Sequence, residues 1–186
     1  MVALASLWLP ILLAAVFVFV TSSILHMAMT YHRRDYKQLP REAERLAALG
    51  GSDLAPGLYN FPYCASQKEM GAPEMRERLN RGPVGLLIAF PNGPVRMGKY
   101  LGGWFVYLLV VSFFIAYLAA HTLAPGVRYL AVFRVVGAAA FLVYGLGRVV
   151  DSIWMGVPWG NTVRGIVDGF VYALVTAGTF GWLWPR

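Results

Sequence analysis

Hydrophobic and polar positions separate along the chain into four long apolar runs and one long polar stretch. The apolar runs occupy residues 1–30, 102–123, 128–150 and 163–185. Each is about long enough to cross a hydrocarbon core of roughly 30 Å when coiled at about 1.5 Å per residue. The pattern predicts an all-α membrane protein with four transmembrane helices. The last three helices form one unit, residues 102–186.

The polar stretch, residues 31–101, is too long for a bare connection and predicts a small insertion with local structure of its own. Residues 40–49 and 73–80 favour short helices, the first ending at Gly50-Gly51. Residues 82–91 form an apolar run bounded by prolines that is too short to span a membrane. This run could be a segment dipping into the membrane interface, but we expect a strand that pairs with residues 58–64 in a β-hairpin.

Small residues recur every four positions along the last apolar run and form a stripe on one helical face. The stripe consists of Gly165, Gly169, Ala173, Ala177 and Gly181. Helices in lipid associate through close van der Waals contact, which small residues allow. We therefore expect the last helix to be the one against which the others pack.

Composition supports the membrane assignment, since 58% of the residues are hydrophobic and only 13% are charged, against about 25% in soluble proteins. The formal net charge is +7, and 11 of the 16 Lys and Arg residues lie between Arg33 and Lys99. None precedes the first apolar run, so the positive-inside rule predicts both termini outside and residues 31–101 in the cytoplasm of a bacterium, with the spans in its inner membrane.

Seven acidic residues in the same segment, and the lack of a nucleic-acid-binding motif, argue against nucleic-acid binding by these basic residues. The lipid bilayer is the expected contact of the basic residues.

Five ionisable residues of the predicted spans fall at a similar depth, within about 10 Å along the bilayer normal near the cytoplasmic side. They are His26, Arg148, Asp151, Arg164 and Asp168. The leading interpretation is structural, with ion pairs Arg164–Asp168 and Arg148–Asp151 at helical spacing. The alternatives are a binding or proton-handling site in which His26 titrates, and snorkelling of the charges to the interface.

Two further candidates, Arg134 and His121, lie in the outer half of the bilayer, where an anionic group or the headgroups could meet Arg134. We predict no metal site and no cofactor. His121 is in the opposite leaflet from His26, and His26 and His32 are six residues apart, on different faces of a continuous helix. The single cysteine, Cys64, excludes an internal disulfide and predicts a free thiol whose role stays open.

The absence of a recognisable catalytic constellation favours an accessory or structural membrane protein without catalytic activity of its own. Such a protein would act through a protein partner or as a homo-oligomer in the membrane. The alternative is a carrier of a small molecule, proton or ion, or a membrane enzyme, using the polar cluster around His26 and Asp168. A water-accessible cavity that reaches His26 would favour the alternative, and a closed, fully paired cluster would favour the accessory protein.

Overall fold

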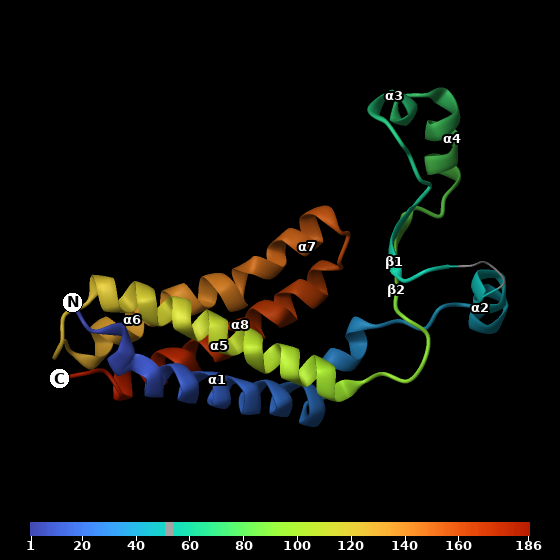
Figure 1. Ribbon diagram of the computed structural model, residues 1–186. Helices are drawn as coiled ribbons and strands as arrows, with labels where there is room; N and C mark the ends of the chain where they lie inside the picture. The colour runs from blue at the N-terminus through green and yellow to red at the C-terminus, as the bar shows by residue number, and fades with distance from the viewer. Residues whose placement is uncertain (51–53) are drawn as a thin grey trace. The chain divides into compact units, whose positions relative to one another are not determined.

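The computed structural model describes residues 1–50 and 54–186, which form two compact units (Figure 1). One unit comprises Met1–Tyr36 and Arg96–Arg186, and the other comprises Lys37–Val95. The first unit contains four helices, Leu4–Ala28, Met97–Thr122, Tyr129–Trp154 and Trp159–Trp182, that are long and apolar enough to cross a membrane. The predicted four-helix membrane architecture is thereby confirmed at the level of helix number, length and composition.

Two of the four spans are continuous α-helices and two are segmented. The two continuous helices are α5 (Met97–Thr122) and α8 (Trp159–Trp182). The first span joins a 3-10 turn, Leu4–Leu7, to α1 (Trp8–Ser23) and a π-helical turn, Ile24–Ala28. The third span joins α6 (Tyr129–Tyr144) through a 3-10 turn, Leu146–Arg148, to α7 (Val149–Trp154). Compared with the sequence-based boundaries, α5 and α8 begin earlier, at Met97 and Trp159, and end earlier, at Thr122 and Trp182.

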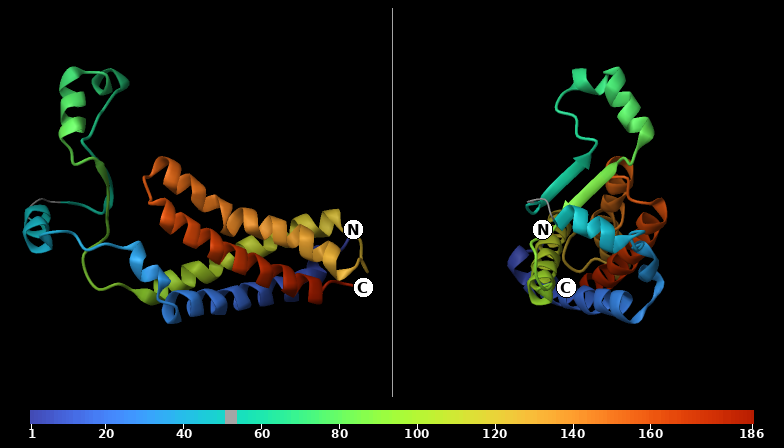
Figure 2. Two further views of the ribbon diagram at one scale, coloured as in Figure 1. Left: turned by 180° about the vertical axis from the view of Figure 1, so that it is seen from behind. Right: turned by 90° about the vertical axis from the view of Figure 1, so that its right-hand side faces the viewer.

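Both chain termini lie at one end of the bundle, beside the turn between α5 and α6 (Figure 2). The backbone N–H of Val2 donates to the carbonyl of Ala120 at 3.2 Å, and that of Gly126 donates to Pro185 at 2.9 Å. The indole Nε1 of Trp184 donates to the Ala124 carbonyl at 3.1 Å. With four spans and both termini together, residues 29–36 and the turn between α7 and α8 lie at the opposite end.

The small-residue stripe of α8 lies against α6, its most extensive neighbour. A Cβ placed on Gly169 would come within 2.5 Å of the backbone of Gly145, so the two main chains are in direct contact there. A Cβ on Gly137 would lie 3.3 Å from that of Ala177, and one on Gly181 would meet the ring of Tyr129 at 2.6 Å. Helices α6 and α8 can approach closely here because the stripe residues of α8 have no side chain or only a methyl group.

The first span packs on both α8 and α5 through small and aliphatic side chains. Ala14, Ala15 and Val18 of α1 are fully buried. On α5 the indole Nε1 of Trp104 donates to Ser22 Oγ at 3.0 Å and links the two helices. The opposite face of α5 exposes large apolar side chains such as Phe114, which suits contact with lipid.

The second unit is built around a two-stranded antiparallel sheet. Strand β1 (Gly57–Phe61) pairs with β2 (Gly85–Ala89) in the register Gly57 to Ala89 and Phe61 to Gly85, which confirms the strand interpretation of residues 82–91. The predicted helices at 40–49 and 73–80 correspond to α2 (Glu42–Gly50) and α4 (Pro73–Arg81). Gly51, the second half of the predicted helix stop, lies outside the described residues.

One element of this unit was not expected from the sequence, the short helix α3 (Gln67–Met70). Ser66 Oγ accepts the N–H of Glu69 at 3.2 Å, and a Glu69 carboxylate oxygen accepts the N–H of Ala65 at 2.9 Å. The spacing of Ser66 and Glu69 is that of a capping box, which is a sequence signal for a helix start.

Candidate functional site

The first span ends abruptly, and its end brings a polar turn against α8. After the π-helical turn, Met29 is extended, with φ −90° and ψ 135°. Residues Tyr31–Asp35 then form a 3-10 turn that contacts α8. The π-helical turn is wider than an α-helical one, and single π-helical turns in α-helices often occur at functional sites. The helix therefore ends at Met29, and the turn that follows places Tyr31, His32 and Asp35 against the N-terminal half of α8.

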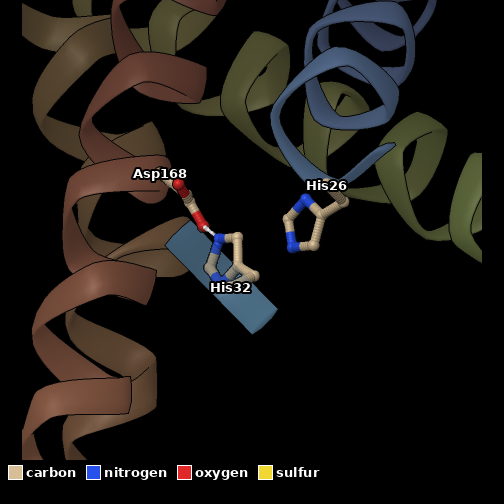
Figure 3. Close-up of side chains that lie close together, drawn as sticks. All are labelled: His26, His32 and Asp168. Atoms are coloured by element: carbon tan, nitrogen blue, oxygen red, sulfur yellow. Dashed lines mark hydrogen bonds and ion pairs between the residues drawn. The ribbon is translucent and has the colours of Figure 1, made fainter. Parts of the chain in front are cut away.

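His32 is held between two carboxylates that come from different elements. Its Nδ1 lies 2.6 Å from Asp35 Oδ2, and its Nε2 lies 2.7 Å from Asp168 Oδ2 on α8. Figure 3 shows the second of these contacts. An ionised carboxylate only accepts hydrogen bonds, so wherever both carboxylates are ionised His32 is the donor in both contacts. His32 thus connects the turn after the first span to the buried carboxylate of α8.

Asp35 is fixed in turn by the N-terminal turns of α8. Arg164 Nε donates to Asp35 Oδ1 at 2.6 Å, and Asn161 Nδ2 donates to the Asp35 carbonyl at 2.9 Å. Arg164 also donates to Asn161 Oδ1 at 2.8 Å. Burial acts to raise the pKa of the Asp35 carboxyl, but hydrogen bonds from His32 and Arg164, with the charges behind them, outweigh burial and lower it. The carboxylate is therefore held in its charged form.

Asp168 is the buried centre of the cluster, with only 3% of its surface exposed. Besides His32, it accepts a hydrogen bond at Oδ1 from the hydroxyl of Tyr31. Burial and then this hydrogen bond raise the pKa of Tyr31, so the phenol stays a donor. Two donors on two oxygens satisfy a carboxylate that would be costly to bury alone.

The structure does not form the ion pairs proposed from helical spacing. Arg164 pairs with Asp35 instead of Asp168, with Nη2 at 2.5 Å from Asp35 Oδ1, because the turn after the first span supplies a carboxylate beside it. Asp168 is occupied by Tyr31 and His32. Nor does an ion pair join Arg148 to Asp151 in the described structure, where both residues are exposed and Arg148 lies across Gly165.

The premise that His26 and His32 occupy different faces of one helix is also wrong, because the helix ends between them. The two imidazole rings stack with centroids 4.4 Å apart and planes within 8°. His26 Nδ1 lies 3.0 Å from the Ser22 carbonyl and so carries the proton that it donates. His26, His32 and Asp168 each offer a ligand atom within 4.8 Å of the others (Figure 3).

The two outer-half candidates do not join this cluster. His121 lies in the last turn of α5, where its Nδ1 is 2.7 Å from the Tyr117 carbonyl. Arg134 is an exposed residue of α6 and has no hydrogen bond or ion pair with any residue of the described ranges.

The cluster predicted from the sequence lacks four members that the structure adds, Tyr31, His32, Asp35 and Asn161. Three of them follow the first span and Asn161 begins the last one. A continuous first helix would place His32 and His26 on different faces, which is why the sequence separates these two residues. A usable signal was present: Asp35 interrupts the basic run after the first span three residues after His32, a spacing that places both on one side of a helical turn.

A pocket of about 460 Å³ opens beside this cluster in the same unit. Its lining includes Ser22, His26, Trp104, Arg148 and Tyr172, together with apolar residues of the first span and α5. Tyr172 is 4% exposed, and its hydroxyl has no hydrogen-bond partner in the described part of the chain. A second pocket, of about 670 Å³, shares Trp104, Arg148 and Tyr172 with the first. These three residues thus line both pockets.

Comparison with known proteins assigns no relative: no family model, no curated protein and no solved structure matches the chain.

Proposed function

We propose that this membrane protein binds a small amphipathic acid, with a carboxylate or phosphate on an apolar body, in the pocket beside the polar cluster. The observation that carries the proposal is the polar chemistry of the pocket wall. Arg148 has no ion pair in the described structure, and the buried Tyr172 hydroxyl has no hydrogen-bond partner. A buried donor without a partner costs roughly 1–3 kcal/mol, which a ligand oxygen would recover.

The remaining lining supports an apolar body for the ligand. Met27, Met97, Leu101 and the indole of Trp104 surround the same pocket. Binding sites for small molecules are mostly apolar, with a few placed polar groups that fix orientation. A guanidinium and a phenol beside an aliphatic wall therefore favour an acid with a hydrocarbon portion over a free inorganic anion.

The pocket also bears on the choice between the two functions expected from the sequence. It reaches His26, which is the feature that favours a binder, carrier or enzyme over an accessory subunit. Any membrane helix is expected to expose an apolar face, so the exposed face of α5 is not evidence for a protein partner. An accessory role remains the second proposal. Co-purification of a protein partner from native membranes, with no small molecule retained, would support it.

We also propose placement in a bacterial inner membrane with both termini outside and residues 37–95 in the cytoplasm. Support comes from the basic residues that follow the first span. The shared location of the two termini at one end of the bundle is consistent with this topology.

Purification from native membranes in polymer-bounded lipid particles, followed by mass spectrometry of retained small molecules, tests the binding proposal. We expect one acidic amphiphile enriched over bulk lipid in the wild-type protein. Because a hydrogen bond to a charged group contributes about 1.5–3 kcal/mol, Arg148→Gln should reduce retention by about ten- to a hundredfold. Tyr172→Phe should reduce it less.

The matched control is Arg134→Gln, which removes an exposed, unpaired arginine from the same span and should leave retention unchanged. Equal small-molecule content in the wild type and Arg148→Gln would refute the proposal. In that case Tyr172→Phe should raise stability, since it removes a buried hydroxyl that has no partner.

A further inference from the structure

We infer that His26, His32 and Asp168 form a site for a divalent transition metal, with zinc as the best match to two imidazoles and one carboxylate. The inference rests on different residues from the pocket's Arg148 and Tyr172. Ligand atoms of the three residues lie within 4.8 Å of one another at the junction of the first span and α8. No other group of three His, Cys, Asp or Glu side chains with this spacing occurs in residues 1–50 and 54–186.

Two of the three ligand atoms are already near the spacing that a shared ion requires. His32 Nε2 and Asp168 Oδ2 are 2.7 Å apart. Zinc holds nitrogen and oxygen ligands at about 2.0–2.2 Å in tetrahedral geometry, so two adjacent ligand atoms lie about 3.4 Å from each other. An ion between this nitrogen and this oxygen therefore needs the contact to open by about 0.7 Å.

His26 completes the site after a rotation of its side chain. Parallel stacked rings direct their in-plane lone pairs side by side, so the 4.4 Å stack is not itself a coordination geometry. His26 is exposed, and its Nδ1 is engaged with the Ser22 carbonyl, which leaves Nε2 as the unprotonated nitrogen. A change in its side-chain torsions can therefore bring Nε2 toward the other two ligands without displacing the backbone.

The residues around the ligands resemble the supports that metal-binding histidines require. Histidine ligands usually donate their second ring nitrogen to a carboxylate, which fixes the tautomer and increases basicity. Asp35 occupies that position on His32 Nδ1 and is itself held by Arg164. Tyr31 donates to the remaining oxygen of Asp168. Both supporting interactions persist if a metal replaces the proton on His32 Nε2.

One ligand of the proposed site is a carboxylate that pairs with no arginine in the described structure. Arg164 pairs with Asp35, whereas Asp168 contacts Tyr31 and His32. A bound cation would offset the charge of this buried carboxylate. Three protein ligands also leave a coordination position open, as in zinc sites that act on a bound water or substrate. His26 lines the 460 Å³ pocket, from which a further ligand could enter.

Titration of the full-length, chelator-stripped protein in detergent with Co²⁺ and Zn²⁺ tests the site. Cobalt reports its coordination through visible absorption, and calorimetry reports zinc stoichiometry. We expect one ion per chain with micromolar or tighter affinity. His32→Ala and Asp168→Asn should abolish binding, His26→Ala should weaken it at least tenfold, and Asp35→Asn should weaken it by about 10- to 100-fold.

The matched control is His121→Ala. The Nδ1 of His121 contacts the carbonyl of the residue four positions earlier, as the Nδ1 of His26 does, but His121 lies at the other end of the bundle. This variant should bind like the wild type. If His32→Ala or Asp168→Asn fails to fold, the exposed His26 still permits the test. Absence of saturable, equimolar binding by the wild type, or unchanged affinity in a folded His26→Ala variant, would overturn the site. Neither result affects small-molecule retention through Arg148, so the two proposals fail separately.

Discussion

Replacement of Gly169 by alanine is the smallest perturbation that tests how α8 packs. The added methyl group would lie 2.5 Å from the Cα and N atoms of Gly145 and from the carbonyl carbon of Tyr144. All three are backbone atoms, so no side-chain rotation can relieve the contact. Ordinary carbon contacts occur at about 3.5–4.0 Å. The methyl group therefore requires α6 and α8 to separate by about 1 Å at this point.

The expected loss can be estimated from two opposed terms. Inserting a methyl group into a tightly packed site costs roughly 1–3 kcal/mol, and backbone neighbours place Gly169 toward the upper part of that range. Replacing a glycine inside a helix by alanine gains about 1 kcal/mol in helix propensity. The net expectation is a destabilisation of about 1–2 kcal/mol.

Gly178 provides a matched control on the same helix. A Cβ there would meet only the Tyr129 hydroxyl, at 3.8 Å, which is ordinary contact. Gly178→Ala should therefore leave stability unchanged or raise it by up to about 1 kcal/mol. Unfolding in a detergent mixture by titration with dodecyl sulfate, followed by circular dichroism, measures both variants. Equal stability of Gly169→Ala and Gly178→Ala would refute the close contact between α6 and α8.

Three further predictions follow from named contacts. Arg164→Gln removes the guanidinium from Asp35 and should destabilise the protein by about 1–3 kcal/mol, whereas Arg134→Gln should have no effect in the same unfolding assay. Trp104→Phe removes the hydrogen bond to Ser22 and should cost about 1 kcal/mol, compared with no loss for Trp8→Phe, whose side chain is 63% exposed. Reporter enzymes that act only outside the cytoplasm should be active when fused at either terminus and inactive near residue 70; the reverse pattern would invert the proposed topology.

The sequence was sufficient to predict the spans, because length and hydrophobicity alone decide whether a helix can cross a bilayer. The hairpin was also predictable, since the run at 82–91 is apolar, bounded by prolines and too short to span. The ends of the helices were harder to predict from the sequence. The early starts of α5 and α8 include polar or interfacial residues such as Lys99 and Asn161 that hydropathy excludes from a span.

The polar cluster was predictable in part. Depth along the bilayer normal indicated that His26, Arg164 and Asp168 lie at one level, but depth does not specify partners. The partners depend on a break in the first helix at Met29, which no proline or glycine marks. That break turns Tyr31, His32 and Asp35 back toward α8, and it replaces the expected pairing within one helix by contacts across more than a hundred residues.

A double-mutant cycle on His32 and Asp168 tests the central claim, the docking of the turn after the first span onto α8, most directly. His32→Ala, Asp168→Asn and the double variant are unfolded in chelator, so that no metal contributes. Contact across the 2.7 Å hydrogen bond predicts a coupling free energy of about 1–3 kcal/mol, with the double variant less destabilised than the sum of the singles. Additive effects within about 0.5 kcal/mol would show that the two side chains do not interact and would contradict the account.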